Sequence, residues 1–277
     1  MNWLQSIMMG LISGLCEPMP VSAEAHRGLL ANFFGLTAPE PLFLLICHAA
    51  VLIVVLSAGG LELRRLWRTI KILRAPRHRR TAHASLNQVG TLRLLYGSAL
   101  LTIIGRLLSY RLLSIAQRLW LLAIPLIITG LLLWLPTHFR TANKDGRHLS
   151  TPDGLIFGLA ALVSAVPGIS LVGAVLAMAS MRGTQRQYAV RFAWILLSLS
   201  LTTAVVMDLL LVIGSGVSLE LTQLISLGLG GASAALGARL AIQFVRSRTR
   251  SGATGINGFS FYNWGMALLC LALFLLV

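Results

Sequence analysis

More than half of this 277-residue chain is hydrophobic (56%), and only 11% of it is charged. Ordinary soluble domains do not have this composition, and the long continuous apolar runs exclude an alternating β-barrel, so we expect an all-α polytopic membrane protein. The net charge of +15 does not indicate nucleic-acid binding, because the basic residues lie between apolar runs, where membrane topology and anionic lipids account for them.

The first polar cluster lies within an apolar stretch at residues 10–26, GLISGLCEPMPVSAEAH. It contains Glu17, Ser22, Glu24 and His26. Ionisable side chains at membrane depth are costly and are therefore candidates for function. The two prolines after the first glutamate disfavour a continuous helix, which predicts a half-helix, a break and a second half-helix.

Residues 155–182 repeat this pattern. An apolar run ends at a Val-Pro-Gly break containing Gly168, Ser170 follows, and a second apolar run begins. Two interrupted apolar segments in corresponding halves of a chain are typical of a binding site near the membrane midplane.

Six further apolar segments have about the length that crosses a bilayer. They are residues 42–61, 92–109, 119–136, 192–213, 222–245 and 259–277. Between the first two lies the basic segment 62–91, whose first half is either an interfacial amphipathic helix or a plain basic loop on the cytoplasmic face. All 277 residues are expected to form one integral-membrane domain.

The distribution of lysine and arginine predicts the topology. If residues 153–182 enter the membrane and return, every strongly basic loop lies on one side, which the positive-inside rule makes the cytoplasm. The same reasoning makes residues 1–36 a re-entrant pair that opens outward. The two pairs would form an inverted-topology repeat whose breaks meet near mid-membrane, where half-helix N-termini suit a phosphate or a carboxylate.

Two motifs resemble the signatures of the undecaprenyl-diphosphate phosphatases, the bacitracin-resistance family. One is EPMPVS at residues 17–22 followed by His26, and the other is PGIS at residues 167–170 followed by Gly173. The resemblance runs in order along nearly the whole chain.

This resemblance implies a plasma-membrane enzyme that removes the terminal phosphate of a polyprenyl diphosphate to recycle the carrier lipid for cell-wall synthesis. It implies a site that opens to the outer face and uses a divalent cation, Mg²⁺ or Ca²⁺. The implied catalytic residues are Glu17 and His26, with Glu17 also a metal ligand, and the implied substrate-binding residues are Ser22, Gly168, Ser170 and Gly173.

The chain departs from the family pattern at several site positions. Ser13, Ala23 and Leu171 stand where the family has a glutamate, a serine and an arginine. Glu24 stands where the family has a threonine, and we hypothesise that it is catalytic and replaces the carboxylate lost at Ser13.

Three functions therefore stay open. The first is a phosphatase with a degenerate site, and the second is a non-catalytic protein that binds or translocates a polyprenyl phosphate. The third is a small-solute or proton-coupled transporter with Glu17, His26 and Asp208 as a proton relay. His48 is interpreted as a helix-packing residue. Small-residue spacing from Gly228 to Gly237 permits close packing within one chain or in a homodimer.

Overall fold

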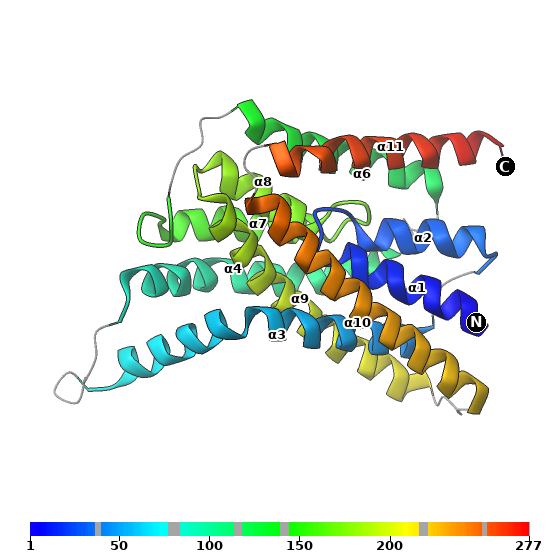
Figure 1. Ribbon diagram of the computed structural model, residues 1–277, viewed down its shortest axis with the longest axis horizontal. Coiled ribbons are helices and arrows are strands. Elements are labelled where there is room, and N and C mark those ends of the chain that lie inside the picture. The colour runs from blue at the N-terminus through cyan, green and yellow to red at the C-terminus, as the bar shows by residue number, and fades with distance from the viewer. Residues whose placement is uncertain are drawn as a thin grey trace.

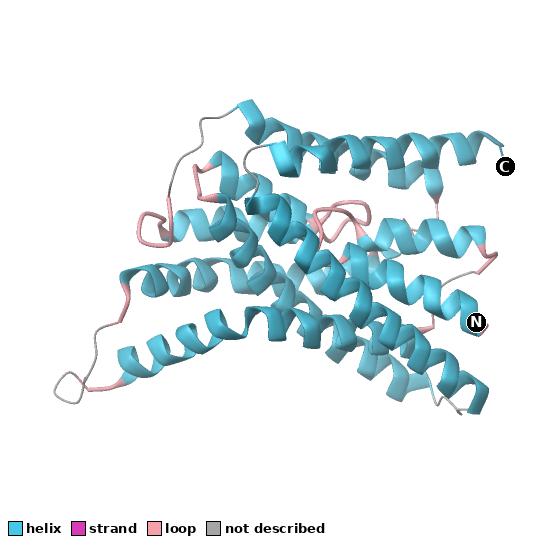
Figure 2. Ribbon diagram, viewed as in Figure 1, coloured by secondary structure: helices cyan, strands magenta, loops and turns pink. Residues whose placement is uncertain are grey.

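The computed structural model describes residues 1–36, 40–76, 84–113, 118–138, 144–215, 221–250 and 254–276. In these ranges the secondary structure is helical, apart from one isolated β-bridge between Lys144 and Thr184 (Figure 2). The elements are α1 (Trp3–Cys16), α2 (Ala23–Phe33), α3 (Pro41–Arg74), α4 (Leu86–Arg111), α6 (Leu119–Trp134), η2 (Leu135–His138), α7 (Thr151–Val163), α8 (Leu171–Met181), α9 (Arg186–Ser215), α10 (Leu221–Arg250) and α11 (Thr254–Leu276). The predicted all-α polytopic class is confirmed.

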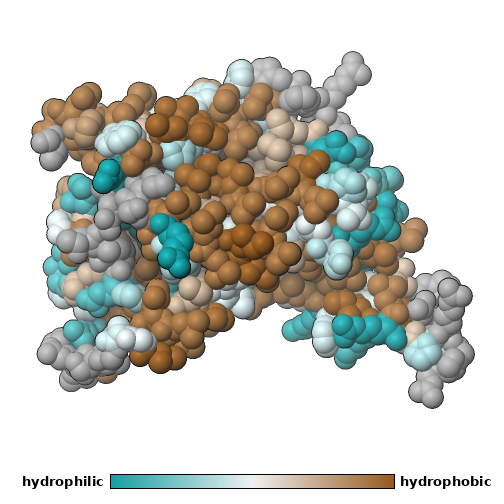
Figure 3. Space-filling model, turned by 180° about the vertical axis from the view of Figure 1, so that it is seen from behind, coloured by the Kyte–Doolittle hydropathy of each residue, from teal (hydrophilic) through white to brown (hydrophobic). Residues whose placement is uncertain are grey.

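Five helices, α3, α4, α9, α10 and α11, are long and apolar enough to cross a membrane. They correspond to five of the six predicted spans, although Val277 lies outside the described residues. The sixth predicted span, 119–136, is the shorter helix α6 of 16 residues together with the start of the 3-10 turn η2. A broad apolar band crosses the middle of the surface, with hydrophilic side chains concentrated toward its ends (Figure 3).

Helix α3 continues well past the predicted end of its span at residue 61. It has 34 residues and so measures roughly 51 Å, against about 30 Å for the hydrocarbon core of a bilayer. The helix ends at Arg74, just before Pro76, because the residue preceding a proline disfavours helical backbone. The first part of the basic segment 62–91 is thus an extension of α3 rather than a separate interfacial helix or a loop. Residues 77–83 of that segment lie outside the described residues.

The two predicted breaks are present. One lies between α1 and α2 and the other between α7 and α8, and a serine caps each second half-helix: Ser22 Oγ accepts from Ala25 N, and Ser170 Oγ accepts from Gly173 N. Gly168 has a φ of +103°, a backbone conformation that side chains disfavour. The pair α1–α2 lies toward one side of the molecule and α7–α8 toward the other, with the breaks near the middle (Figure 1).

Helix packing follows the same internal symmetry. When α1, α2, α3, α4 and α6 are matched in order to α7, α8, α9, α10 and α11, the most extensive contacts have counterparts. Helix α1 packs on α10, and α7 packs on α4; α3 packs on α9, and α6 on α11. This is the pattern expected of two repeats related by a two-fold axis.

Glycines allow the closest of these contacts. A Cβ at Gly14 would overlap the carbonyl oxygen of Ala234, and Gly237 of α10 likewise faces α1, whereas a Cβ at Gly230 would first meet the Phe43 ring of α3. Their small-residue spacing therefore serves packing within the chain, whereas Gly228 faces open space.

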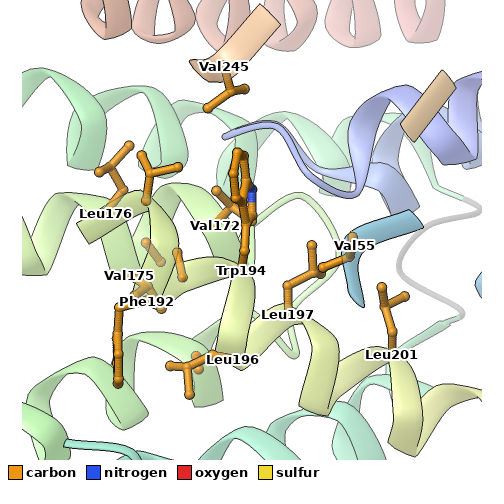
Figure 4. Close-up of a cluster of buried hydrophobic side chains, with 14 of the residues drawn as sticks. Val55, Val172, Val175, Leu176, Phe192, Trp194, Leu196, Leu197, Leu201 and Val245 are labelled. Carbon is orange, nitrogen blue, oxygen red and sulfur yellow. The ribbon is translucent and has the colours of Figure 1, made fainter. Parts of the chain in front are cut away.

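Helix α9 lies at the centre of the core. Its residues Phe192 and Leu196 face Val172 and Val175 of α8, while Val55 of α3 approaches from the other side (Figure 4). The same helix contacts the first break, through Trp194, and the basic end of α3, through Arg191.

Candidate functional site

A cavity of about 30 Å³ lies between the two breaks, with room for about two water molecules. Its lining includes the N-cap residues Ser22 of α2 and Ser170 of α8. Two half-helix N-termini, each with partial positive charge, therefore meet at one cavity, as predicted. The other polar lining residues are Glu17, Glu24, Arg106, Ser109, Ser164 and Ser200.

Direct hydrogen bonds hold the two breaks together. Ser22 Oγ accepts from Gly168 N at 3.0 Å, in addition to capping α2. Ser170 Oγ contacts the carbonyl oxygen of Met19 at 3.3 Å. Three of the four predicted substrate-binding residues, Ser22, Gly168 and Ser170, therefore lie together between the breaks. The fourth, Gly173, follows in the first turn of α8, where its N–H is bonded to Ser170 Oγ.

A buried chain of charges begins at the break between α1 and α2. Arg27 Nη1 lies 3.2 Å from Glu17 Oε1, and its Nη2 lies 3.6 Å from Glu24 Oε1. Arg106 of α4 donates to the same Glu24 oxygen at 2.9 Å. Carboxylates and guanidinium groups alternate, so each charge has an opposite neighbour.

The chain of charges continues into α3 and α9. Arg106 Nη2 donates to His48 Nε2 at 3.0 Å, and His48 Nδ1 donates to Asp208 Oδ2 at 2.6 Å. Tyr110 donates to the other oxygen of Asp208, also at 2.6 Å. A neutral imidazole with its proton on Nδ1 satisfies both contacts. With His48 neutral, three carboxylates and two guanidinium groups give this cluster a formal charge of −1.

Several members of this cluster were missed in the sequence. The sequence suggests only a helix-packing role for His48 and a place in the alternative proton relay for Asp208, and it does not single out Arg27 or Arg106. His48, Arg106 and Asp208 all lie inside predicted spans, where an ionisable side chain is by itself a signal of function. The cost of burying such charges makes this cluster a stronger candidate for function than for stability.

His26 lies outside this arrangement. Its Nδ1 donates to the Ser22 carbonyl oxygen at 2.6 Å, and its Nε2 accepts from Tyr262 of α11 at 2.7 Å. Its ring stacks on Tyr262, and His26 does not line the cavity. The imidazole beside Glu17 is instead that of His48, at 3.7 Å. A catalytic role for His26 stays a prediction.

The positions that depart from the family pattern also have defined surroundings. Ser13 is fully buried and donates to the Met9 carbonyl oxygen within α1, so it is not part of the cavity lining. Ala23 and Leu171 do line the cavity. Arg106 lines it too, so a guanidinium group reaches the cavity from α4 although position 171 has none.

The implied divalent cation does not fit this arrangement. Among the described residues, no group of three or more His, Cys, Asp and Glu side chains is placed to hold a metal ion. Glu17 and Glu24 share Arg27 between them, and a cation at that position would have to displace it. We therefore assign no chemical step to a metal.

Sequence comparison identifies the family. The family model described as bacitracin resistance protein BacA matches residues 6–269. The chain belongs to this family. Among its relatives, an undecaprenyl-diphosphatase of Carboxydothermus hydrogenoformans is 28% identical over 99% of this chain and 98% of its own length. That of Desulforapulum autotrophicum is 26% identical over 82% of this chain and 84% of its own length. That of Micrococcus luteus is 29% identical over 71% of this chain and 70% of its own length.

Proposed function

We propose that this protein binds the diphosphate group of a polyprenyl lipid between the two breaks and hydrolyses its terminal phosphate, with Arg106 in place of the family arginine. One observation carries the proposal: Arg106 lines the same cavity as the N-caps of both half-helices. Relatives named undecaprenyl-diphosphatase support the choice of substrate.

The binding step uses groups that favour anions. The N-termini of α2 and α8 supply N–H groups, and an arginine can hold a phosphate through two parallel hydrogen bonds. A cavity of about 30 Å³ is smaller than a diphosphate needs, so the two breaks must separate for the lipid to enter. The Ser22–Gly168 hydrogen bond is the contact that opens in this step.

Hydrolysis requires positioning and charge stabilisation more than covalent chemistry by the protein. A water molecule attacks the terminal phosphorus while the bond to the bridging oxygen breaks, which leaves the lipid monophosphate and inorganic phosphate. Glu24, which lines the cavity, accepts a proton of the attacking water. Arg106 stabilises the negative charge of the transferred group, and Arg27 keeps the two glutamates together.

The basic residues give the proposed orientation. Arg65, Arg191 and Arg246 come from three helices and line one groove, so these basic segments share one end of the molecule. By the positive-inside rule we place this end in the cytoplasm of a cell with the protein in its plasma membrane. The α1–α2 pair then enters from the outer face, and we expect the site to open toward that face.

The test is phosphate release from undecaprenyl diphosphate by the purified protein in detergent. We expect release by the wild type and a loss of at least about 100-fold in Arg106→Leu, because an arginine at the transferred group supplies several powers of ten in rate. Arg111→Leu is the matched control, because Arg111 is exposed on the same helix. Equal release by all three proteins would remove Arg106 from the mechanism.

Binding without hydrolysis is the second candidate. It is favoured by the pairing of Glu17 and Glu24 with arginines, which leaves neither carboxylate free to act as a base. If the wild type retains the lipid through purification but releases no phosphate above a Glu24→Ala background, the protein binds or translocates the lipid instead.

A further inference from the structure

A second cavity, of about 280 Å³, lies where α3, α9 and α10 meet. We call it the basic groove, because its charged lining residues are Arg65, Arg191, Arg246 and a single acid, Glu62. Its volume is near the lower end of the range for small-ligand pockets, roughly 300–1,000 Å³. None of its lining residues lines the cavity between the breaks, so it is a separate site.

The arginines of the groove are oriented mainly by backbone carbonyls. Arg246 Nη2 donates to the Ala58 carbonyl oxygen at 2.8 Å, and Arg191 Nε donates to that of Gln187 at 3.2 Å. Arg65 lies 3.7 Å from Glu62, a distance too long for a good hydrogen bond. Three arginines and one glutamate give the groove a formal charge of +2, and these positive charges are arranged around an opening.

Much of the rest of the lining is apolar, although Gln187, Ser198 and Thr249 also contribute to it. The apolar part includes Val55, Leu61, Val190 and Ile195, together with Trp194, whose ring lies under the Arg246 guanidinium at 5.5 Å. Leu61 is 73% exposed, so this apolar wall reaches the outer surface of α3. A free inorganic anion would make no use of such a wall, whereas an amphiphile would use both parts of the groove.

We propose that the basic groove binds the headgroup of an anionic glycerophospholipid. Arg191 and Arg246 hold its phosphate, and the acyl chains follow the apolar wall toward the surface. Glu62 distinguishes this ligand from a bare phosphate, because its carboxylate accepts a hydrogen bond from a headgroup hydroxyl such as those of glycerol. Glu62 is itself oriented by Gln88, which donates to its Oε1 at 2.9 Å.

The test measures lipid retention by native mass spectrometry of the purified protein titrated with phosphatidylglycerol. Arg191→Gln/Arg246→Gln removes two groove charges, and Arg64→Gln/Arg68→Gln removes two exposed charges of α3 that do not line the groove. We expect about 100-fold weaker binding in the first pair, because each of the two lost charged hydrogen bonds weakens binding about tenfold, and no change in the second. Arg191→Gln alone loses only a bond to its own helix and should weaken binding without affecting folding.

Three results would overturn the proposal. Equal weakening in both double variants would mean diffuse attraction to a basic surface rather than a site. Equal retention of phosphatidylcholine and phosphatidylglycerol would mean that the headgroup is not recognised. Displacement of the lipid by an equal concentration of inorganic phosphate would mean that the groove binds free phosphate.

Discussion

Arg106 Nη1 lies 2.9 Å from Glu24 Oε1, although the two residues are 82 positions apart in the chain. Arg106 lies outside the motifs by which the chain resembles the family, and Glu24 stands at a motif position where the family has a threonine. Their pairing supplies a guanidinium group and a carboxylate to the cavity, where position 171 carries a leucine. The guanidinium group comes from α4 and the carboxylate from α2.

Glu24 should matter for both activity and stability. Glu24→Gln leaves Arg106 buried without its closest carboxylate, and breaking a buried ion pair in this way costs about 3–5 kcal/mol. We expect a lower thermal unfolding midpoint and no phosphate release. Glu40→Gln, at the exposed N-cap of α3, is the control and should change neither property. An unchanged thermal unfolding midpoint for Glu24→Gln would contradict this prediction, because it would mean that the Glu24–Arg106 ion pair does not stabilise the folded protein.

A variant of His26 distinguishes a reaction that uses this imidazole from one that does not. His26→Ala removes two hydrogen bonds and a stacked ring but no group that lines the cavity. We expect a loss of stability of about 1–3 kcal/mol with less than tenfold loss of phosphate release. If His26 is the general base or nucleophile that the family resemblance implies, release will fall by several powers of ten while the protein stays folded.

Trp194 connects the basic groove to the break beside Glu17. Its ring lines the groove, and its Nε1 donates to the Pro18 carbonyl oxygen at 3.0 Å. Trp194→Phe removes this bond and should lower the free energy of unfolding by about 1 kcal/mol. Trp120→Phe, on the half-exposed side of α6, serves as the control. Equal unfolding curves for the two variants would show that this hydrogen bond does not stabilise the break.

Glycine contacts between α1 and α10 should be sensitive to a single methyl group. Gly14→Ala places its Cβ against the backbone of Ala234, which cannot move away as a side chain could. We expect poor yield of folded protein, measured as the monodisperse fraction after detergent extraction. Gly59→Ala has open space in α3 and should be neutral or stabilising by up to about 1 kcal/mol. Equal yields would contradict the close packing.

Local signals explain which parts of the architecture were predictable. The prolines after Glu17 and the capping serines at positions 22 and 170 act on neighbouring residues, so both breaks could be located from the sequence. The end of α3 is also marked locally, by Pro76, but a span of bilayer length ends at residue 61, and nothing in the composition of residues 62–74 stops the helix before that proline.

The site itself depended on contacts between distant residues. Ser22, Ser170 and Glu24 line one cavity, because the inverted repeat brings the breaks together, and their roles there stay predictions. The pairing of Arg106 with Glu24 and the contact of His26 with Tyr262, 236 residues later, follow only from helix packing. Sequence spacing contains no information on either contact.

The most direct measurement is phosphate release by Arg106→Leu and by the same variant with Leu171→Arg added. The two positions line one cavity, so a guanidinium group at position 171 should replace the one lost from α4. We predict that Arg106→Leu loses release and that the double variant regains a measurable part of it. Full release by Arg106→Leu alone would contradict the account, because it would mean that the reaction uses neither arginine.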